Sequence, residues 1–251
     1  MAHVGVLRVL EESGISIDCI AGTSAGAIVG GGYAAGVSVD ELEAVALTLR
    51  WRDLGQFAFS RLGIQSSELM ENFIRERLPV KRFEDLRIPF AAVATDLIEG
   101  KPVVMRDVGD IAFAIRASCN LPVLYVPAVD EKGRQLVDGG LVANIPTKVV
   151  RSLGADVVIA VDVNAEGAKF IGTPQSAFGV LLQSLLVVQR NAAAVQLQET
   201  DSVIRPRVGH LRWDEVNRAA EFIKAGEEAA REMVDEIRDL IEAKMKIEAQ
   251  P

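Results

Sequence analysis

Histidine, cysteine and aromatic residues are scarce in this sequence, and each shortage excludes a class of function. The 251 residues include two histidines (His3 and His210), two cysteines (Cys19 and Cys119) and 5% aromatic residues. Two cysteines are too few for a disulfide framework or a zinc site. The formal net charge of −8 disfavours nucleic acid as a partner, because binding to phosphates requires a basic surface. No phosphate-binding loop, dinucleotide-binding motif or His-Glu-x-x-His motif is present, so we expect neither a cofactor nor a bound metal.

The length and composition predict one domain that spans residues 1–251. Hydrophobic residues make up 49% and charged residues 25% of the chain, as in an ordinary globular protein. The first residues do not resemble a signal peptide. Two uncharged stretches, 19–39 and 170–189, approach the ~20 residues that cross a bilayer, but their small residues, proline and glutamines favour buried segments. We therefore expect a cytoplasmic protein.

Helical and strand patterns alternate along the chain, and this alternation predicts an α/β domain. We expect three layers, α/β/α, around a mostly parallel central sheet. The motif-bearing core is expected over about residues 2–163 and a helical C-terminal part over about 174–248. The expected strands include 15–21, 90–96 and 156–163, and the expected helices include 2–12, 25–35, 174–199 and 213–248.

The motif Gly-Thr-Ser-Ala-Gly at residues 22–26 is the strongest indication of chemistry. A Gly-x-Ser-x-Gly pattern alone is weak, but this one follows an apolar strand and precedes a helix of small residues, as a nucleophile elbow requires. In such an elbow Ser24 projects its hydroxyl from a sharp turn, and side chains at Gly22 and Gly26 would collide. The N–H of Ala25, at the positive end of the helix, is expected to point at the oxyanion. The alternative is a plain glycine turn in which Ser24 only caps the helix.

A serine nucleophile requires a base, and the sequence offers two candidates. Asp138 ends a predicted strand, where catalytic groups of open α/β sheets gather, and Gly139 and Gly140 let the backbone turn behind its carboxylate. Burial beside Ser24 would have to raise the pKa of this aspartate. His210 would complete an α/β-hydrolase triad, but only one visible strand precedes Ser24, and a lone histidine in a loop is typical of a solvated surface. We favour the Ser24–Asp138 dyad and keep the triad as the alternative.

Three motifs together resemble the patatin-like phospholipases, particularly their bacterial branch. They are Gly-Thr-Ser-Ala-Gly after a strand, Arg-Ala-Ser-Cys-Asn-Leu-Pro at residues 116–122, and Asp-Gly-Gly-Leu-Val-Ala-Asn-Ile-Pro at residues 138–146. The opening Ala-His-Val-Gly-Val-Leu helix and the strand segment Ala-Thr-Asp-Leu-Ile-Glu-Gly fit the same pattern. The resemblance spans about residues 2–163.

The resemblance implies a hydrolase of lipid or lysolipid acyl esters that needs no cofactor, with Ser24 as the nucleophile and Asp138 as the base. Arg116 and Asn120, in the second motif, are expected to orient loops near the active site, although a helix-terminal salt bridge explains Arg116 equally well. We also expect transient contact with a membrane surface, which makes the protein peripheral to the membrane. Acyl transfer to another lipid uses the same acyl-enzyme and stays open, as does a non-catalytic lipid-binding or regulatory role.

One element of the family is not seen before the first helix. The family begins with a β-strand and a glycine-rich loop that supplies oxyanion-hole N–H groups, whereas the helix here begins at residue 2. The run Gly30–Gly32 falls inside the helix after the elbow, where close packing explains it. Losing one oxyanion donor costs about 3–4 kcal/mol of transition-state stabilisation. We therefore expect these residues to hydrolyse esters poorly and to expose an unpaired position in the sheet.

Two further segments each allow two interpretations. Trp51, Phe57 and Phe59, beside Arg52 and Arg61, form either a lip at the lipid entrance or satellite core residues. The last expected helix alternates charges on one face with apolar residues on the other. That pattern predicts a surface helix packed on the core, with a partner-binding helix as the alternative.

Overall fold

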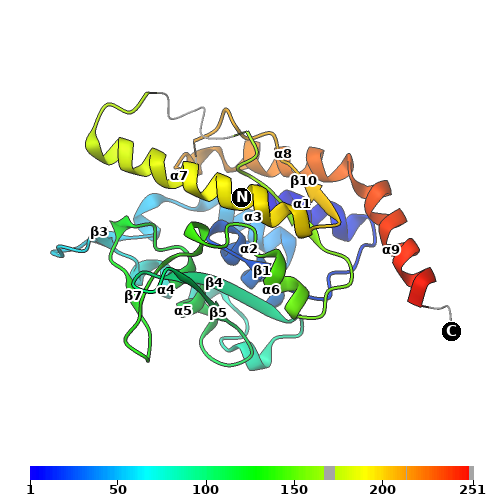
Figure 1. Cartoon of the computed structure of the whole chain (residues 1–251), viewed down its shortest axis with the longest axis horizontal. Helices are drawn as coiled ribbons and strands as arrows, with labels where there is room; N and C mark the ends of the chain where they lie inside the picture. The colour runs from blue at the N-terminus through cyan, green and yellow to red at the C-terminus, as the bar shows by residue number, and fades with distance from the viewer. Residues whose placement is uncertain (167–172, 213, 249–251) are drawn as a thin grey trace.

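The computed structural model describes residues 1–166, 173–212 and 214–248, which form an α/β/α arrangement of helices around a sheet (Figure 1). The largest core cluster lies between helices α2, α4 and α5 and strand β4, and includes Phe90, Ile111 and Ile115. The α-helices are α1 (Ala2–Glu12), α2 (Ala25–Ala34), α3 (Val39–Thr48), α4 (Glu68–Arg77), α5 (Ile111–Ser118), α6 (Thr147–Ser152), α7 (Ala177–Gln196), α8 (Ala219–Arg231) and α9 (Val234–Glu248).

The strands are short, apart from the fully buried β4. They are β1 (Ile20–Gly22), β2 (Gln56–Phe57), β3 (Gly63–Ser66), β4 (Phe90–Asp96), β5 (Lys101–Met105), β6 (Val123–Tyr125), β7 (Ala128–Val129), β8 (Gln135–Asp138), β9 (Ile159–Val161) and β10 (Ser202–Ile204). The 3-10 helices are η1 (Trp51–Asp53), η2 (Phe83–Asp85), η3 (Gly139–Leu141), η5 (Leu197–Glu199) and η6 (Val216–Arg218).

Local signals in the sequence set several helix boundaries. Gly14, with a φ of 69°, follows the end of α1, as its conformational freedom allows. Ser38 and Glu41 form a capping box at the start of α3, in which each side chain accepts a hydrogen bond from the backbone N–H of the other residue. Asp110 caps α5 by accepting the N–H of Phe113 at 2.8 Å. These ends agree with the sequence within one or two residues.

The main sheet is mixed, which corrects the expectation of a mostly parallel sheet. Strand β4 pairs with β1 in parallel but with β5 and β8 in antiparallel fashion, and β7 and β8 are antiparallel as well. Short connections at 97–100 and 130–134 explain the β4–β5 and β7–β8 pairs, because a tight turn can only join antiparallel neighbours, while β8 pairs with β4 across a long connection. The three-layer α/β fold itself is confirmed.

A cavity separates the main sheet from a second, two-stranded sheet. Strands β9 and β10 pair in parallel, and among the described strands β1 pairs with β4 alone. The cavity has a volume of about 620 Å³ and is lined by 19–22 around β1 and by 157–161 around β9. Strand β1 is therefore an edge strand of the main sheet among the described residues.

The C-terminal part packs closely on the first helix. A Cβ added at Gly5 of α1 would lie 2.0 Å from the carbonyl oxygen of Ile223, and one at Gly226 of α8 would lie 2.0 Å from that of Ala2. The two backbones therefore touch where the helices cross. The expected single helix over 213–248 is divided into α8 and α9, and its apolar residues join the core, as a surface helix packed on the domain requires.

Helix α7 differs from its prediction because it is largely exposed. The window Gly179–Glu199 is long and apolar enough to cross a membrane, and 11% of it is buried in the protein. The expectation of a buried segment is therefore wrong for this helix, while the start of the stretch, 170–172, lies outside the described residues. Figure 1 shows α7 running across one side of the molecule. The other uncharged stretch, 19–39, holds β1 and α2, and α2 packs on β1 and β4.

Candidate active site

Ser24 occupies the sharp turn between β1 and α2 in a strained backbone conformation. Its φ is 52° and its ψ is −121°, a combination that residues other than glycine rarely adopt. The N–H of Ser24 donates to the Oγ of Ser118 at 2.9 Å, and that hydroxyl donates to the carbonyl oxygen of Val93 at 2.6 Å. A buried chain of hydrogen bonds therefore fixes the turn to α5 and β4.

The two glycines of the motif differ in how tightly they are packed. A Cβ added at Gly22 would lie 2.5 Å from the carbonyl oxygen of Gly26, so no side chain fits there. A Cβ at Gly26 would meet only the Nε2 of His3, at an ordinary 3.7 Å. The expected collision at Gly26 is therefore wrong, because its Cβ direction faces the space beside His3 instead of β1. The expected close packing of Gly30–Gly32 is confirmed, since each added Cβ would lie within 3.0 Å of a neighbouring side chain.

Asp138 is buried at the end of β8, and its carboxylate meets the side chain of Ser24. It is 1% exposed. Burial raises the pKa of Asp138 to about 6, while hydrogen bonds from the Ser24 side chain and from the N–H of Gly140 act to lower it. The Gly140 N–H lies 2.7 Å from Oδ1. The structure thus brings together the two residues that the sequence singled out.

The backbone around Asp138 is held by neighbours on three elements. Its N–H donates to the carbonyl oxygen of Asn120 at 2.9 Å, and the Thr95 hydroxyl donates to its carbonyl oxygen at 2.8 Å. The buried Asn120 donates from Nδ2 to Val126 at 3.0 Å. A Cβ added at Gly139 would lie 2.1 Å from the carbonyl oxygen of Val93, so this position requires glycine. Asn120 therefore links the backbone of Asp138 to that of Val126.

Three residues near the site were missed by sequence reasoning. Ser118 holds the elbow, and the buried thiol of Cys119 shares a hydrogen bond with Ser24. Burial raises the pKa of that thiol well above its usual range, and the charge of Asp138 adds to the effect. Gln189 of α7 covers the turn, since a Cβ on Gly140 would lie 2.5 Å from its Nε2. The motif at 116–122 contains the first two, whereas the only signal at Gln189 is a polar residue in the uncharged stretch 170–189.

Arg116 forms an ion pair away from Ser24. Its Nε lies 2.6 Å from the Oε2 of Glu71, so it joins α5 to α4. Of the two interpretations of Arg116, the structure therefore shows the salt bridge.

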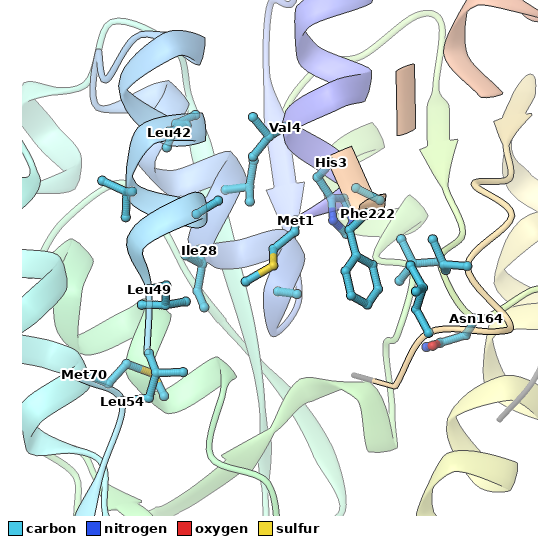
Figure 2. A pocket seen from close by; sticks show the side chains of 18 of the residues that line it. Met1, His3, Val4, Ile28, Leu42, Leu49, Leu54, Met70, Asn164 and Phe222 are labelled. Carbon is cyan, nitrogen blue, oxygen red and sulfur yellow. The ribbon is translucent and has the colours of Figure 1, made fainter. Parts of the chain in front are cut away.

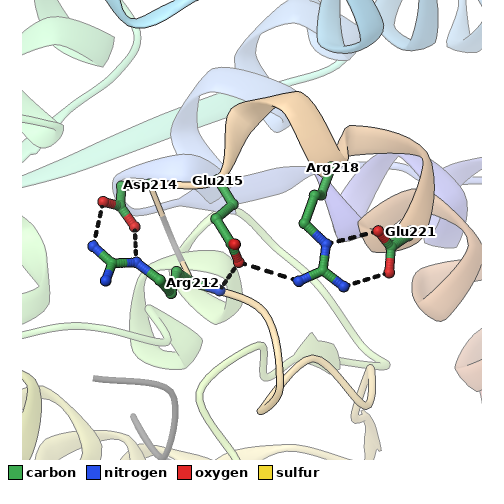
Figure 3. A network of polar contacts seen from close by, with 5 residues as sticks. All are labelled: Arg212, Asp214, Glu215, Arg218 and Glu221. Carbon is green, nitrogen blue, oxygen red and sulfur yellow. Dashed lines mark hydrogen bonds and ion pairs between the residues drawn. The ribbon is translucent and has the colours of Figure 1, made fainter. Parts of the chain in front are cut away.

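His210 lies on an exposed turn that leads to a network of ion pairs. The network joins Arg212, Asp214, Glu215, Arg218 and Glu221 (Figure 3). The hydrogen bond from Arg218 lowers the pKa of Glu221, and the charge of His210 contributes to the same effect. His210 is exposed on this turn, while burial, Ser24 and Gly140 account for the pKa of Asp138.

An apolar cavity of about 320 Å³ adjoins the elbow. Ala25, the first residue of α2, lines it together with residues of α1, α3, α4 and α8. Figure 2 shows these side chains converging, with Asn164 contributing a polar group at one side. Burial lowers the pKa of His3 to about 3, so its imidazole is neutral at physiological pH. The labelled lining residues are Met1, His3, Val4, Ile28, Leu42, Leu49, Leu54, Met70, Asn164 and Phe222.

This geometry agrees with the family to which the sequence belongs. Residues 1–151 match the family model described as patatin-like phospholipase. The chain belongs to the patatin-like phospholipase family. The family supports hydrolysis of lipids as the general function of this patatin-like domain, and the resemblance noted from the three motifs is confirmed.

Relatives of this patatin-like domain occur in bacteria and animals. The chain is 38% identical over 170 residues to an uncharacterized NTE family protein of Mycobacterium tuberculosis, which covers 66% of this chain and 46% of that protein. It is 35% identical over 171 residues to a patatin-like phospholipase domain-containing protein of Caenorhabditis elegans, and the match covers 65% of this chain and 13% of that protein. It is 31% identical over 179 residues to human patatin-like phospholipase domain-containing protein 6, and the match covers 68% of this chain and 13% of that protein. The chain therefore spans less than half the length of the mycobacterial relatives.

Proposed function

We propose that this patatin-like domain hydrolyses acyl esters of lipids or lysolipids through an acyl-enzyme on Ser24, with Asp138 as the base. One observation carries the proposal: the side chain of the strained Ser24 meets the buried carboxylate of Asp138, whose pKa is raised to about 6. Such a carboxylate is largely ionised at neutral pH and still basic enough to accept a proton from a hydroxyl that attacks a carbonyl carbon.

The first half of the reaction transfers the acyl group to the protein. The Ser24 Oγ forms a bond to the ester carbonyl carbon while its proton passes to Asp138. The tetrahedral intermediate then collapses, the bond from carbon to the alcohol oxygen breaks, and the leaving alcohol takes the proton from Asp138. In the second half, water gives a proton to Asp138 and attacks the acyl-enzyme, which releases the fatty acid and restores the Ser24 hydroxyl.

The oxyanion is stabilised at the start of α2. The N–H of Ala25 lies at the positive end of this helix, where developing negative charge is favoured. The N–H of Ser24 itself is occupied by Ser118 and does not take part. One such donor contributes about 3–4 kcal/mol of transition-state stabilisation.

The acyl chain occupies the apolar cavity beside Ala25 (Figure 2). Its walls consist mainly of aliphatic side chains, which suit a hydrocarbon chain and offer few partners to a polar one. The ester carbonyl then lies near the elbow, with the tail directed toward Ile28 and Met70.

Hydrolysis of a soluble p-nitrophenyl ester and of a lysophospholipid tests the dyad with two variants. We expect Asp138→Ala to abolish turnover and His210→Ala to retain it, since His210 lies on an exposed turn. Turnover retained in Asp138→Ala would rule out the dyad. Turnover lost in His210→Ala would instead favour the Ser24–Asp138–His210 triad.

A further inference from the structure

Helix α7 presents apolar side chains to solvent and glutamines to the protein. Gln189 is buried against Gly140, and the side-chain amide of Gln196 accepts from the N–H of Ile145 at 2.7 Å and donates to the carbonyl oxygen of Val142 at 2.9 Å. A helix at a water surface ordinarily has the opposite arrangement. The exposed large side chains of α7 are Val180, Leu181, Val187, Val188 and Val195.

The exposed face of α7 is also almost uncharged. Arg190 is the only charged residue in 177–196. Exposed side chains at 180, 184, 187, 188 and 195 follow the spacing of a single helix face, so the four valines lie on one side of α7, together with the exposed polar residues Ser184 and Asn191. A large apolar patch on a soluble protein marks an interaction site with another apolar surface.

A hairpin formed by β2 and β3 adds exposed aromatic side chains. Phe57 is 70% exposed and Phe59 is completely exposed, and their rings meet edge to face at a centroid distance of 5.3 Å. Leu62 and Ile64 of the same hairpin are exposed as well. Of the two interpretations of these phenylalanines, burial in a satellite core is therefore wrong.

Two arginines beside this hairpin are free to bind anions. Arg52 and Arg61 are exposed, and no ion pair joins either of them to another described residue. The base of the hairpin is held in place, because the Nε1–H of Trp51 donates to the carbonyl oxygen of Asp214 at 2.5 Å. Asp214 belongs to the ion-pair network of Figure 3, through its bonds with Arg212.

The hairpin and the beginning of α7 lie at the same end of the molecule. They share a cavity of about 340 Å³, lined by Trp51 and Gln65 on one side and by Leu181, Leu182 and Leu185 on the other. Figure 1 shows the hairpin projecting at the end where α7 begins. We call the exposed apolar residues of these two neighbouring elements, taken together, the apolar face.

We infer that the apolar face docks on a phospholipid surface, with Phe57 and Phe59 inserted among the acyl chains and Arg52 and Arg61 at the headgroup phosphates. Aromatic side chains flanked by basic ones are typical of proteins that lie in a membrane interface. The choice of a lipid as partner rests on the proposed function. Leu186 and Val187 of α7 line the apolar cavity, so docking brings the membrane to the acyl-chain site. Because Gln189 and Gln196 hold α7 to the domain, we infer that α7 lies on the membrane and does not cross it.

Co-sedimentation with phosphatidylcholine vesicles, with and without phosphatidylglycerol, tests this docking. The Ser24→Ala protein serves as the parent, so that lipid hydrolysis does not alter the vesicles. We expect the parent to sediment with vesicles, and Phe57→Ser with Phe59→Ser to weaken its partitioning by about tenfold or more. We expect Val180→Ser, Val188→Ser and Val195→Ser together to weaken it similarly, and Arg52→Gln with Arg61→Gln to remove the gain from phosphatidylglycerol.

Ile98→Ser with Val108→Ser is the matched control, since both residues are comparably exposed but lie on other turns. This pair should leave partitioning unchanged. A parent that does not bind vesicles, or control and apolar-face variants that bind equally, would overturn the inference. So would a dimer in sedimentation equilibrium that Val188→Ser dissociates, because the face would then bind a second copy. Hydrolysis of a soluble ester by the Phe57→Ser, Phe59→Ser protein with Ser24 intact reports the proposed function separately.

Discussion

The N–H of Ser24 donates to the hydroxyl of Ser118 at 2.9 Å, and this bond ties the strained elbow to helix α5. The same hydroxyl donates its proton to Val93 at 2.6 Å, so its lone pair is directed to Ser24. The position of Ser24 is therefore set in part by the second sequence motif, 116–122, which lies almost a hundred residues away in the chain.

Ser118→Ala removes the acceptor for the Ser24 N–H and leaves that donor buried without a partner. We expect kcat for a soluble ester to fall by about tenfold or more with little change in KM, because the turn relaxes away from its strained conformation. The free energy of unfolding should fall by about 1–3 kcal/mol, which urea denaturation measures.

Ser67→Ala is a suitable control for this substitution. Ser67 is also a buried serine, but its hydroxyl has no hydrogen-bond partner among the described residues. We expect it to leave kcat unchanged. Equal kcat values for Ser118→Ala and the unaltered protein would show that the bond does not position Ser24.

Local patterns in the sequence predicted the helices well, and long-range packing explains what they missed. Strand β10 spans three residues, Ser202–Ile204, which is too short for a periodic pattern, and its pairing with β9 makes it a strand. The turns at 97–100 and 130–134 explain the antiparallel pairs β4–β5 and β7–β8, but β8 pairs with β4 across a long connection, which no local pattern predicts. Ser24 and Asp138 could be found because each follows a strand and precedes glycine or small residues.

Residues that act across elements could not be found in this way. Gln189 reaches Gly140 only because α7 crosses the turn after β8, a contact with no signal at either position in the sequence. The exposure of α7 was also missed, since an uncharged helix is ordinarily buried and its inward glutamines reverse the usual pattern.

Ester hydrolysis should depend on pH through Asp138. The carboxylate must be ionised to accept the proton of Ser24, and burial raises its pKa to about 6. We therefore expect kcat/KM for a soluble ester to be low in acid, to rise through a pH of about 6, and to level off above it. The His210→Ala protein should give the same profile, and a profile that loses its acidic limb in that variant would contradict the assignment.

Asp138→Asn should stabilise the fold while removing activity. The folded-state pKa of about 6 lies above the ordinary 3.8, so the folded protein binds more protons than the unfolded chain between these values. Ionising the buried carboxylate therefore lowers the free energy of unfolding. This destabilisation is absent in acid, grows as the pH rises through this window, and reaches about 3 kcal/mol at neutral pH.

Urea denaturation of both proteins at neutral pH and in acid measures this difference. We expect the Asp138→Asn protein to be the more stable at neutral pH, by up to about 3 kcal/mol, and the advantage to shrink below a pH of about 4. The asparagine can still accept the Gly140 N–H, so that bond is kept as a control within the substitution. A variant that is less stable at neutral pH would mean that the carboxylate is not held at a raised pKa.

The two glycines of the elbow should respond differently to alanine. Gly22→Ala places a methyl group 2.5 Å from the carbonyl oxygen of Gly26, so we expect an unstable protein without activity. Gly26→Ala meets only His3 at 3.7 Å and lies in the first turn of α2, where alanine favours the helix by up to about 1 kcal/mol. Thermal unfolding of the two variants checks this contrast, and an equal loss of stability in both would contradict the packing described.

Labelling with a fluorophosphonate tests most directly whether Ser24 is a nucleophile activated by Asp138. The account predicts one phosphonyl group per chain by intact mass, located by peptide mapping on the peptide that contains Ser24. Ser24→Ala should not be labelled, and Asp138→Asn should be labelled far more slowly. A protein that stays unlabelled, or one that is labelled equally well after Ser24→Ala, would contradict the account.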